Sequence, residues 1–112
     1  MKIYHNPRCS KSRQTLALLQ ENGVKPDVVL YLENNLTADE LRELLAKLGI
    51  TPMQLVRKGE AVWKEKYKVK ELSDDQVIEA MIANPKLIER PIVVKDQSAV
   101  LGRPPENVLE LI

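Results

Sequence analysis

The N-terminal residues 2–32 pass from a strand-forming run to a helix-forming run and back to a strand-forming run. Residues 2–5 (KIYH) are predicted to form a strand. Residues 10–22 are predicted to form a helix that ends at Gly23, because glycine readily adopts the left-handed conformation that closes helices. Residues 28–32 (VVLYL) are a continuous apolar run of strand length. A strand, a helix and a strand at this spacing predict a right-handed parallel βαβ unit, which restricts the chain to an α/β fold.

The single cysteine, Cys9, lies where the first predicted strand gives way to the helix. Asn6-Pro7 is a turn signal, since proline fixes its own φ and biases the preceding residue away from helix. Cys9 therefore falls at the helix N-cap, near unpaired backbone N–H groups. Three cations are near in sequence, namely Arg8, Lys11 and Arg13. Such surroundings lower a cysteine pKa from about 8.5 to roughly 3.5–7.5 and predict a reactive thiolate. The alternative is a small buried hydrophobe without chemistry.

Two neighbours of Cys9 are candidates for supporting roles. His5 would either polarise the turn that carries the cysteine or simply hydrogen-bond at the end of the strand. Ser12 is a candidate hydrogen-bond partner of the sulfur, and it also occupies the fourth position of a Cys-x-x-Cys motif, where the second cysteine would stand. Thr15 occupies the position where a phosphatase-type loop requires arginine. The chemistry is therefore predicted to be monothiol, with any second thiol supplied by another molecule.

The charge balance and the cysteine count exclude several classes of function. Lysine plus arginine (17) nearly equals aspartate plus glutamate (16), so no field of one sign indicates nucleic acid or a membrane surface as partner. One cysteine and one histidine do not furnish a structural zinc set. Without a disulfide, a signal peptide or a long apolar run, we expect a cytoplasmic protein.

The middle of the chain is predicted to be helical. Thr37 and Glu40 form a capping box ahead of leucines at helical spacing, and Gly49 closes that helix. A shorter helix is predicted from Thr51-Pro52 through about residue 58. Residues 60–72 are charged and stay unassigned, with Trp63 and Tyr67 as anchors. Residues 73–83 are predicted to form another capped helix, which Asn84-Pro85 ends.

The last part of the chain is predicted to form a β-hairpin and a helix. Residues 90–94 and 98–101 are strand-forming runs on either side of a polar turn at residues 95–97. Pro104-Pro105 opens a final helix, whose side chains in the core are expected to be Val108, Leu109, Leu111 and Ile112. The whole order matches a single thioredoxin-like α/β domain over residues 1–112. In this plan βαβ and ββα units are joined by an enlarged helical insertion between the second and third core strands, over residues 33–89. By fold analogy, Pro91 occupies the position of a proline that lies opposite the thiol in cis.

Two arginines flank the predicted hairpin. Pairing Val94 with Ser98 sets Arg90 opposite Gly102, next to Arg103, so both guanidinium groups emerge at one end. If Pro91 lies near the thiol, these planar forks would hold an oxyanion in bidentate fashion. The alternative is a pair of surface arginines in ion pairs with nearby carboxylates. Arg57 has no spacing argument and on residue grounds is a charge on a helix surface.

Several motifs together resemble the glutaredoxin-coupled arsenate reductase family, especially its short, reductase-like members. The resemblance extends over nearly the whole chain, and the motifs that carry it are HNPRCSKSR, YLENNLTADEL, LVRK, ERPIVV and GRPPENVLEL. The resemblance implies that Cys9 is the nucleophile that attacks arsenate. It also implies that Arg57, Arg90 and Arg103 bind the oxyanion and its thiolate adduct. His5 would help to keep the sulfur ionised, and Ser12 would hydrogen-bond to it.

The implied mechanism uses thiols from outside the chain. The Cys9 thiolate displaces water from arsenate, glutathione then attacks as co-substrate, glutaredoxin resolves the mixed disulfide, and arsenite leaves. No bound cofactor and no metal are implied, and a monomer is expected. The chain ends soon after the last predicted helix, without the C-terminal extension of longer family members.

Two other classes of function stay open. One is a regulatory adaptor, since a related thioredoxin-like family binds RNA polymerase and senses oxidation. Such sensors usually carry Cys-x-x-Cys, which Ser12 interrupts here. The other is a general glutathione-dependent thiol transferase that acts on protein disulfides. Dependence on arsenate distinguishes the reductase from both alternatives.

Overall fold

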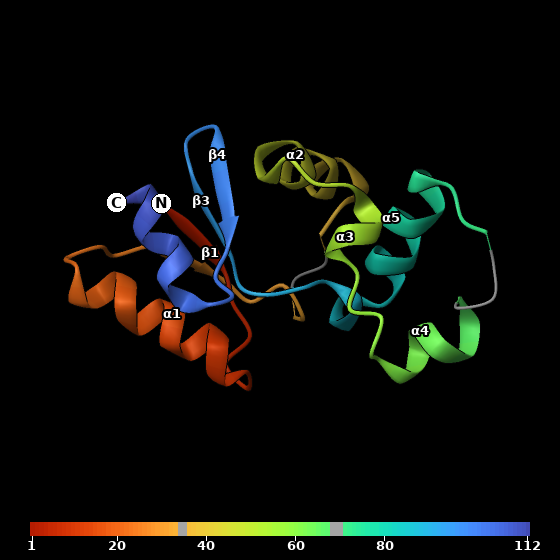
Figure 1. The fold of residues 1–112 in the computed structure, drawn as a ribbon, viewed down its shortest axis with the longest axis horizontal. Coiled ribbons are helices and arrows are strands. Elements are labelled where there is room, and N and C mark those ends of the chain that lie inside the picture. Colours follow the sequence, from red (N-terminus) through yellow and green to blue (C-terminus); the bar gives the residue numbers. More distant parts are fainter. Residues whose placement is uncertain (34–35, 68–70) are drawn as a thin grey trace. The chain divides into compact units, whose positions relative to one another are not determined.

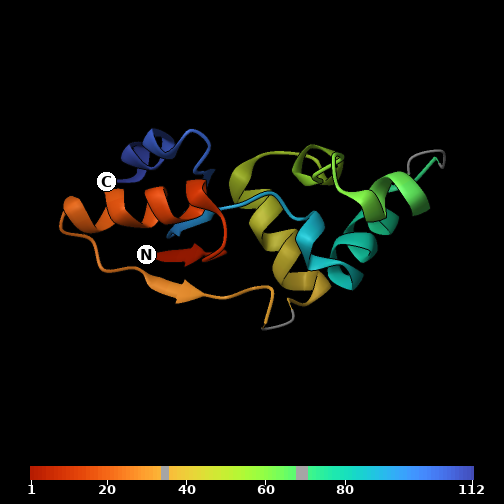
Figure 2. The same cartoon turned by 90° about the horizontal axis from the view of Figure 1, so that it is seen from below.

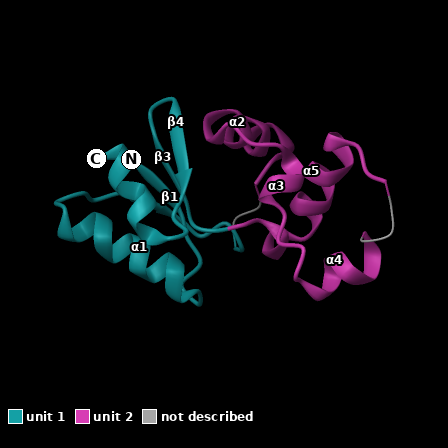
Figure 3. Cartoon of the chain, viewed as in Figure 1, with its two compact units in different colours: residues 1–34, 90–112 teal, residues 35–89 magenta. Residues whose placement is uncertain are grey.

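The computed structural model describes residues 1–33, 36–67 and 71–112. The chain divides into two compact units (Figure 3): unit 1 comprises residues 1–34 and 90–112, and unit 2 comprises residues 35–89. Unit 2 coincides with the helical insertion that the sequence predicts. The single domain over the whole chain stays a prediction.

Unit 1 holds a four-stranded sheet with the order β2-β1-β3-β4. The strands are β1 (Lys2–Tyr4), β2 (Asp27–Val29), β3 (Ile92–Lys95) and β4 (Ser98–Leu101). β1 pairs in parallel with β2 and antiparallel with β3, and β3 pairs antiparallel with β4. Helix α1 (Ser10–Glu21) connects β1 to β2, and the 3₁₀ helix η2 (Pro105–Leu111) follows β4 (Figure 1). The βαβ and ββα plan of the thioredoxin-like fold is therefore confirmed.

The core of unit 1 lies between the sheet and the two helices. Ile3 of β1 and Val93 of β3 are cross-strand partners, and both are fully buried. They cluster with Leu19 of α1 and with Val108 and Leu111 of η2. Helices α1 and η2 pack against each other along this face (Figure 2). The sheet thus holds the N-terminal turn of α1 at the carboxyl end of β1, as the sequence predicts.

The predicted second strand ends too late. It was expected over residues 28–32, whereas β2 covers Asp27–Val29. The Glu33 N–H donates to the Leu30 carbonyl oxygen at 3.0 Å, so the chain turns immediately after the strand. Tyr31 is nevertheless buried. The apolar run therefore covers the end of a strand and a turn, in which Tyr31 is buried and Leu32 is 40% exposed.

The predicted hairpin is correct, but its register is wrong by one residue. Lys95 pairs with Ser98 and Val94 with Ala99, so the turn is shorter than predicted. Asp96 adopts a positive φ of 54°, which a two-residue hairpin turn requires. Continuing this register sets Arg90 opposite Arg103.

The final helix is a 3₁₀ helix, and this changes which residues it buries. A 3₁₀ helix has three residues per turn, so positions three apart share a face. Pro105, Val108 and Leu111 have this spacing and are buried. Leu109 and Ile112 were expected in the core, but they are 45% and 50% exposed.

Unit 2 is helical. It contains α2 (Ala38–Leu48), α3 (Pro52–Leu55), α4 (Ala61–Lys66), α5 (Asp74–Ala83) and the 3₁₀ helix η1 (Pro85–Leu87). α5 packs against α2, α3 and η1. The capping boxes predicted at Thr37 and Ser73 are both present, and Thr51 forms a third with Gln54. Gly49 closes α2 in the left-handed conformation.

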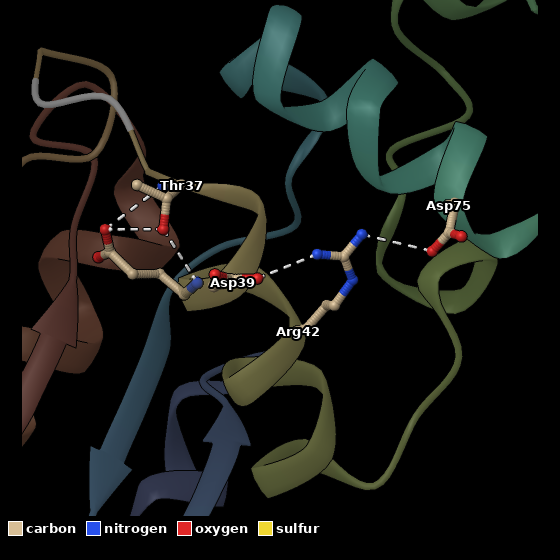
Figure 4. Close-up of polar contacts among 5 residues, drawn as sticks. Thr37, Asp39, Arg42 and Asp75 are labelled. Carbon is tan, nitrogen blue, oxygen red and sulfur yellow. Dashed lines mark hydrogen bonds and ion pairs between the residues drawn. The ribbon is translucent and has the colours of Figure 1, made fainter.

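Charged side chains connect α2 to α5 on the surface of unit 2. Thr37 Oγ1 accepts the Glu40 N–H at 3.1 Å, and the Glu40 carboxylate accepts the Thr37 N–H at 3.3 Å (Figure 4). Arg42 reaches Asp39 at 3.2 Å and Asp75 at 3.4 Å. Because all three ionic side chains are largely exposed, these pairs contribute little to stability.

Two predictions in unit 2 need correction or completion. The helix from Pro52 ends at Leu55 instead of about residue 58, because Val56 forms an isolated antiparallel bridge with Ile88. In the unassigned stretch, α4 forms at Ala61–Lys66, and Trp63 stacks on Tyr67 with ring centroids 5.5 Å apart. Residues 68–70 of that stretch lie outside the described residues.

Candidate active site

Cys9 is the N-cap of α1, with an extended backbone at φ −95° and ψ 123°. The turn before it is held by Asn6, whose side-chain oxygen accepts the Arg8 N–H at 3.0 Å and whose carbonyl oxygen accepts the Cys9 N–H at 3.0 Å. The Arg13 side chain donates to the Pro7 carbonyl oxygen at 2.8 Å. These bonds fix the thiol at the start of the helix, where backbone N–H groups have no partner within the helix.

The thiolate form of Cys9 is stabilised by groups on both sides of it. Burial alone raises the pKa of the Cys9 thiol. Four contributions oppose this effect and together outweigh it, so the pKa lies below its ordinary value: the Ser12 backbone N–H, the charge of Arg90, the Lys11 backbone N–H and a hydrogen bond from the Arg90 side chain. The thiol of Cys9 is therefore more acidic than that of an ordinary cysteine.

Ser12 contacts its neighbours in a different way from that expected. Its hydroxyl lies 2.6 Å from His5 Nδ1 and accepts the Asn6 N–H at 3.0 Å. The contribution of Ser12 to the Cys9 thiolate comes from its backbone N–H. The expected bond from the hydroxyl to the sulfur is thus replaced by a bond from the main chain, and the hydroxyl instead anchors His5.

His5 is buried beside the thiol turn. The backbone N–H of His5 donates to the Val29 carbonyl oxygen at 2.8 Å, and this bond continues the β1–β2 ladder. Burial and the charge of Arg13 lower the pKa of His5. The imidazole is therefore mostly neutral near pH 7, and its Nδ1 contact with the Ser12 hydroxyl ties it to the first turn of α1.

Arg90 and Arg103 flank the base of the hairpin. The peptide bond between Arg90 and Pro91 is cis, as fold analogy implies, and so is the bond that follows Arg103. Gly102 donates its N–H to the Pro91 carbonyl oxygen at 2.9 Å, so the two strand ends stay together beyond the last ladder pair. Arg90 is half-buried and reaches the Cys9 sulfur, whereas Arg103 is exposed. The structure thus brings Cys9, Arg90 and Pro91 into one site.

Thr15 is a part of this site that sequence reasoning missed. It is fully buried, and its hydroxyl lies 3.1 Å from the Gly102 carbonyl oxygen. The sequence pattern indicated only that Thr15 stands where a phosphatase-type loop would require arginine. A signal was present, because Ser12, Thr15 and Leu19 share one helical face, but hydroxyl side chains do not contribute to an apolar pattern.

Arg57 belongs to unit 2. Its guanidinium pairs with Glu60 at 2.5 Å and with Glu89 at 3.8 Å, and its backbone N–H donates to the Leu87 carbonyl oxygen at 2.7 Å. These contacts hold the residue directly after the Val56–Ile88 bridge. Its expected role at the oxyanion stays a prediction.

Residues 1–33, 36–67 and 71–112 hold neither a cluster of metal ligands nor a helix that could cross a membrane. In these residues no group of three or more histidine, cysteine, aspartate or glutamate side chains is placed to hold a metal ion. Within the same ranges no helix has the length and apolar character needed to cross a membrane.

The fold and the site together define a thioredoxin-like protein whose one cysteine lies at the start of the first helix and whose third strand is preceded by a cis-proline. Residues 4–111 match the model of the ArsC family. The chain is 43% identical to an arsenate reductase of Haemophilus influenzae, over 98% of this chain and 97% of that protein. It is 55% identical to YfgD of Escherichia coli (strain K12), described as an uncharacterized protein, over 100% of this chain and 96% of that one.

A solved structure agrees with these matches. The arsenate reductase from Vibrio cholerae superposes with a TM-score of 0.95 at 49% identity, and the match covers 99% of this chain and 96% of that one. The chain belongs to the ArsC family.

Proposed function

We propose that this protein reduces arsenate to arsenite, with glutathione and glutaredoxin as the reductants. The observation that carries the proposal is the contact between the Cys9 thiolate and the Arg90 guanidinium. An anionic nucleophile repels an anionic substrate unless a cation lies beside both. Arg90 meets this need with a planar fork that suits tetrahedral oxyanions. The family membership and the arsenate reductases at 43% and 49% identity support the same substrate.

The first step in this proposal is attack of the Cys9 sulfur on arsenic. The thiolate displaces one oxygen of arsenate. That oxygen takes up protons and leaves as water, and a sulfur–arsenic bond forms. Arsenic stays in the +5 state in this step. Arg90 and Arg103 neutralise the charge on the remaining oxygens, and Arg57 would add a third cation.

The electrons for reduction must come from external thiols, because Cys9 is the only cysteine. Reduction of arsenic from the +5 to the +3 state takes two electrons, and two thiols that join as one disulfide release two. In the proposed cycle the glutathione thiolate attacks the Cys9 sulfur of the adduct, the electron pair of the sulfur–arsenic bond stays on arsenic, and arsenite leaves. This step forms a mixed disulfide between Cys9 and glutathione. Glutaredoxin then takes over the glutathione in a thiol–disulfide exchange, which leaves Cys9 reduced. The protein needs no bound cofactor for this cycle.

The proposal is tested by an assay in which components are left out one at a time. NADPH consumption is followed with arsenate, glutathione, glutaredoxin and glutathione reductase present. Turnover should require each of the first three. Equal turnover with thioredoxin and its reductase in place of glutathione and glutaredoxin would contradict the proposed reductants, and turnover without arsenate would contradict the proposed substrate.

A further inference from the structure

The buried face of α1 begins with two hydroxyl side chains. Ser12 and Thr15 are both 0% exposed, and Leu19 is the first apolar residue of this face that is fully buried. A buried hydroxyl is costly unless it is hydrogen-bonded, so each needs a defined partner. Ser12 bonds to the turn before Cys9. Thr15, one turn further along the helix, reaches the end of β4.

Thr15 packs so closely against Gly102 that no side chain would fit at position 102. Thr15 Oγ1 lies 3.1 Å from the Gly102 carbonyl oxygen and 2.8 Å from the carbonyl oxygen of Lys11. A Cβ atom at Gly102 would lie 2.6 Å from Thr15 Oγ1 and 2.8 Å from Pro91 Cγ. Such distances are closer than a real Cβ tolerates, so Thr15, Gly102 and Pro91 form one tight contact.

This contact is one residue away from both arginines of the hairpin. Arg90 precedes Pro91, and Arg103 follows Gly102. On the helix side, the Lys11 carbonyl that Thr15 contacts belongs to the first turn, whose N–H groups face the Cys9 sulfur. Thr15 therefore lies between the part of the site that carries the thiol and the part that carries the cations.

We propose that Thr15 is a positioning residue, which holds the ends of β3 and β4 against the first turn of α1 and so sets the approach of Arg90 to Cys9. Without the hydroxyl, the Gly102 carbonyl oxygen loses a buried contact, and the strand ends move outward to reach water. Arg90 and Arg103 move with them. The part that concerns arsenate binding rests on the proposed function, whereas the part that concerns the thiol does not.

The test compares Thr15→Val, which keeps the shape and removes the hydroxyl, with Thr15→Ser, which keeps the hydroxyl. The rate of alkylation by iodoacetamide is measured against pH, and it reports Cys9 alone because the chain has one cysteine. In Thr15→Val the thiol pKa should rise by roughly half a unit or more as Arg90 moves away. Thr15→Ser should keep the native profile. With arsenate, Thr15→Val should raise KM more than it lowers kcat.

The control is Leu111→Val, which weakens the core of the same unit without touching the strand ends. If Thr15→Val does not fold, Thr15→Ala makes the same comparison, since alanine also removes the hydroxyl. A native pH profile in the folded variant, or an equal shift in Leu111→Val, would overturn the proposal. The alkylation assay contains no arsenate. A shifted profile in a protein that lacks arsenate turnover would therefore sink the proposed function alone, and an unshifted profile in an active enzyme would sink only the role of Thr15.

Discussion

The Arg90 side chain donates a hydrogen bond to the Cys9 sulfur, although the two residues come from opposite ends of the chain. The contact depends on the antiparallel pairing of β1 with β3, which places the beginning of β3 beside the carboxyl end of β1. A charge-assisted bond of this kind favours the thiolate over the thiol. It therefore couples the topology of the sheet to the reactivity of the site.

Replacement of Arg90 should make the thiol less acidic. In Arg90→Gln the pKa of Cys9 should rise toward its ordinary value, because both the charge and the charge-assisted bond are lost. Arg90→Lys is the matched control, since it keeps the charge and loses the planar fork, and it should give an intermediate value. The pH dependence of alkylation measures both. An unchanged profile in Arg90→Gln would show that the backbone N–H groups act alone.

Loss of Arg103 should affect catalysis and leave the fold intact. Arg103 is exposed, so Arg103→Ala should not change the melting temperature. If its guanidinium binds the oxyanion, arsenate kcat/KM should fall by about tenfold or more, since a hydrogen bond to a charged group contributes roughly 1.5–3 kcal/mol. Lys95→Ala, at the turn end of the same hairpin, is the control. Native kinetics in Arg103→Ala would exclude the residue from the oxyanion site.

The neutral, buried state of His5 predicts a loss of stability in mild acid. The folded pKa lies below the ordinary value of 6.5, so the unfolded chain takes up a proton at a higher pH than the folded chain does. The free energy of unfolding should therefore decrease as the pH falls below about 6.5, until the folded pKa is reached. Chemical unfolding at several pH values measures this for the native chain and for His5→Asn. Above that pH window the free energies of unfolding of the two proteins should change with pH in the same way. Equal pH dependence of the two proteins within the window would contradict the neutral, buried state of His5.

The capping box of α2 should contribute measurably to stability. Thr37→Ala removes the acceptor for the Glu40 N–H and should lower the free energy of unfolding by about 1 kcal/mol. Thr37→Ser keeps that acceptor and should stay close to the native value. Urea unfolding followed by circular dichroism is the measurement. Equal losses in the two variants would mean that the methyl group, and not the cap, is responsible.

Local signals account for most of what the sequence predicted about the fold. The caps at Thr37 and Ser73 and the glycine that ends α2 act within a few residues, so their effects are visible in the sequence. The register of the hairpin was missed because Asp96 takes a positive φ without the glycine that usually marks such a turn. The spacing of η2 was missed because an apolar pattern was interpreted with the α-helical period.

Some residues of the candidate site also have a local signal in the sequence, and others do not. Cys9 and its helix N-terminus are local features. The position of Arg90 and Arg103 at the base of the hairpin followed from its two strands, although the predicted register set Arg90 opposite Gly102. Thr15 depends on a contact with Gly102, far away in the sequence, and its hydroxyl kept it out of the apolar pattern of the helix. Arg57 also lacks a local signal and entered only through resemblance to a family.

The most direct test of the central claim is the amount of arsenite formed from arsenate by the native chain and by Cys9→Ser, with glutathione and glutaredoxin present. Arsenite is measured directly, so oxidation of thiols by other routes does not count. The native protein should form arsenite steadily, and the folded variant should form none above background. Equal formation by both proteins, or none by the native protein with its thiol intact, would contradict the assignment of Cys9 as the nucleophile of an arsenate reductase.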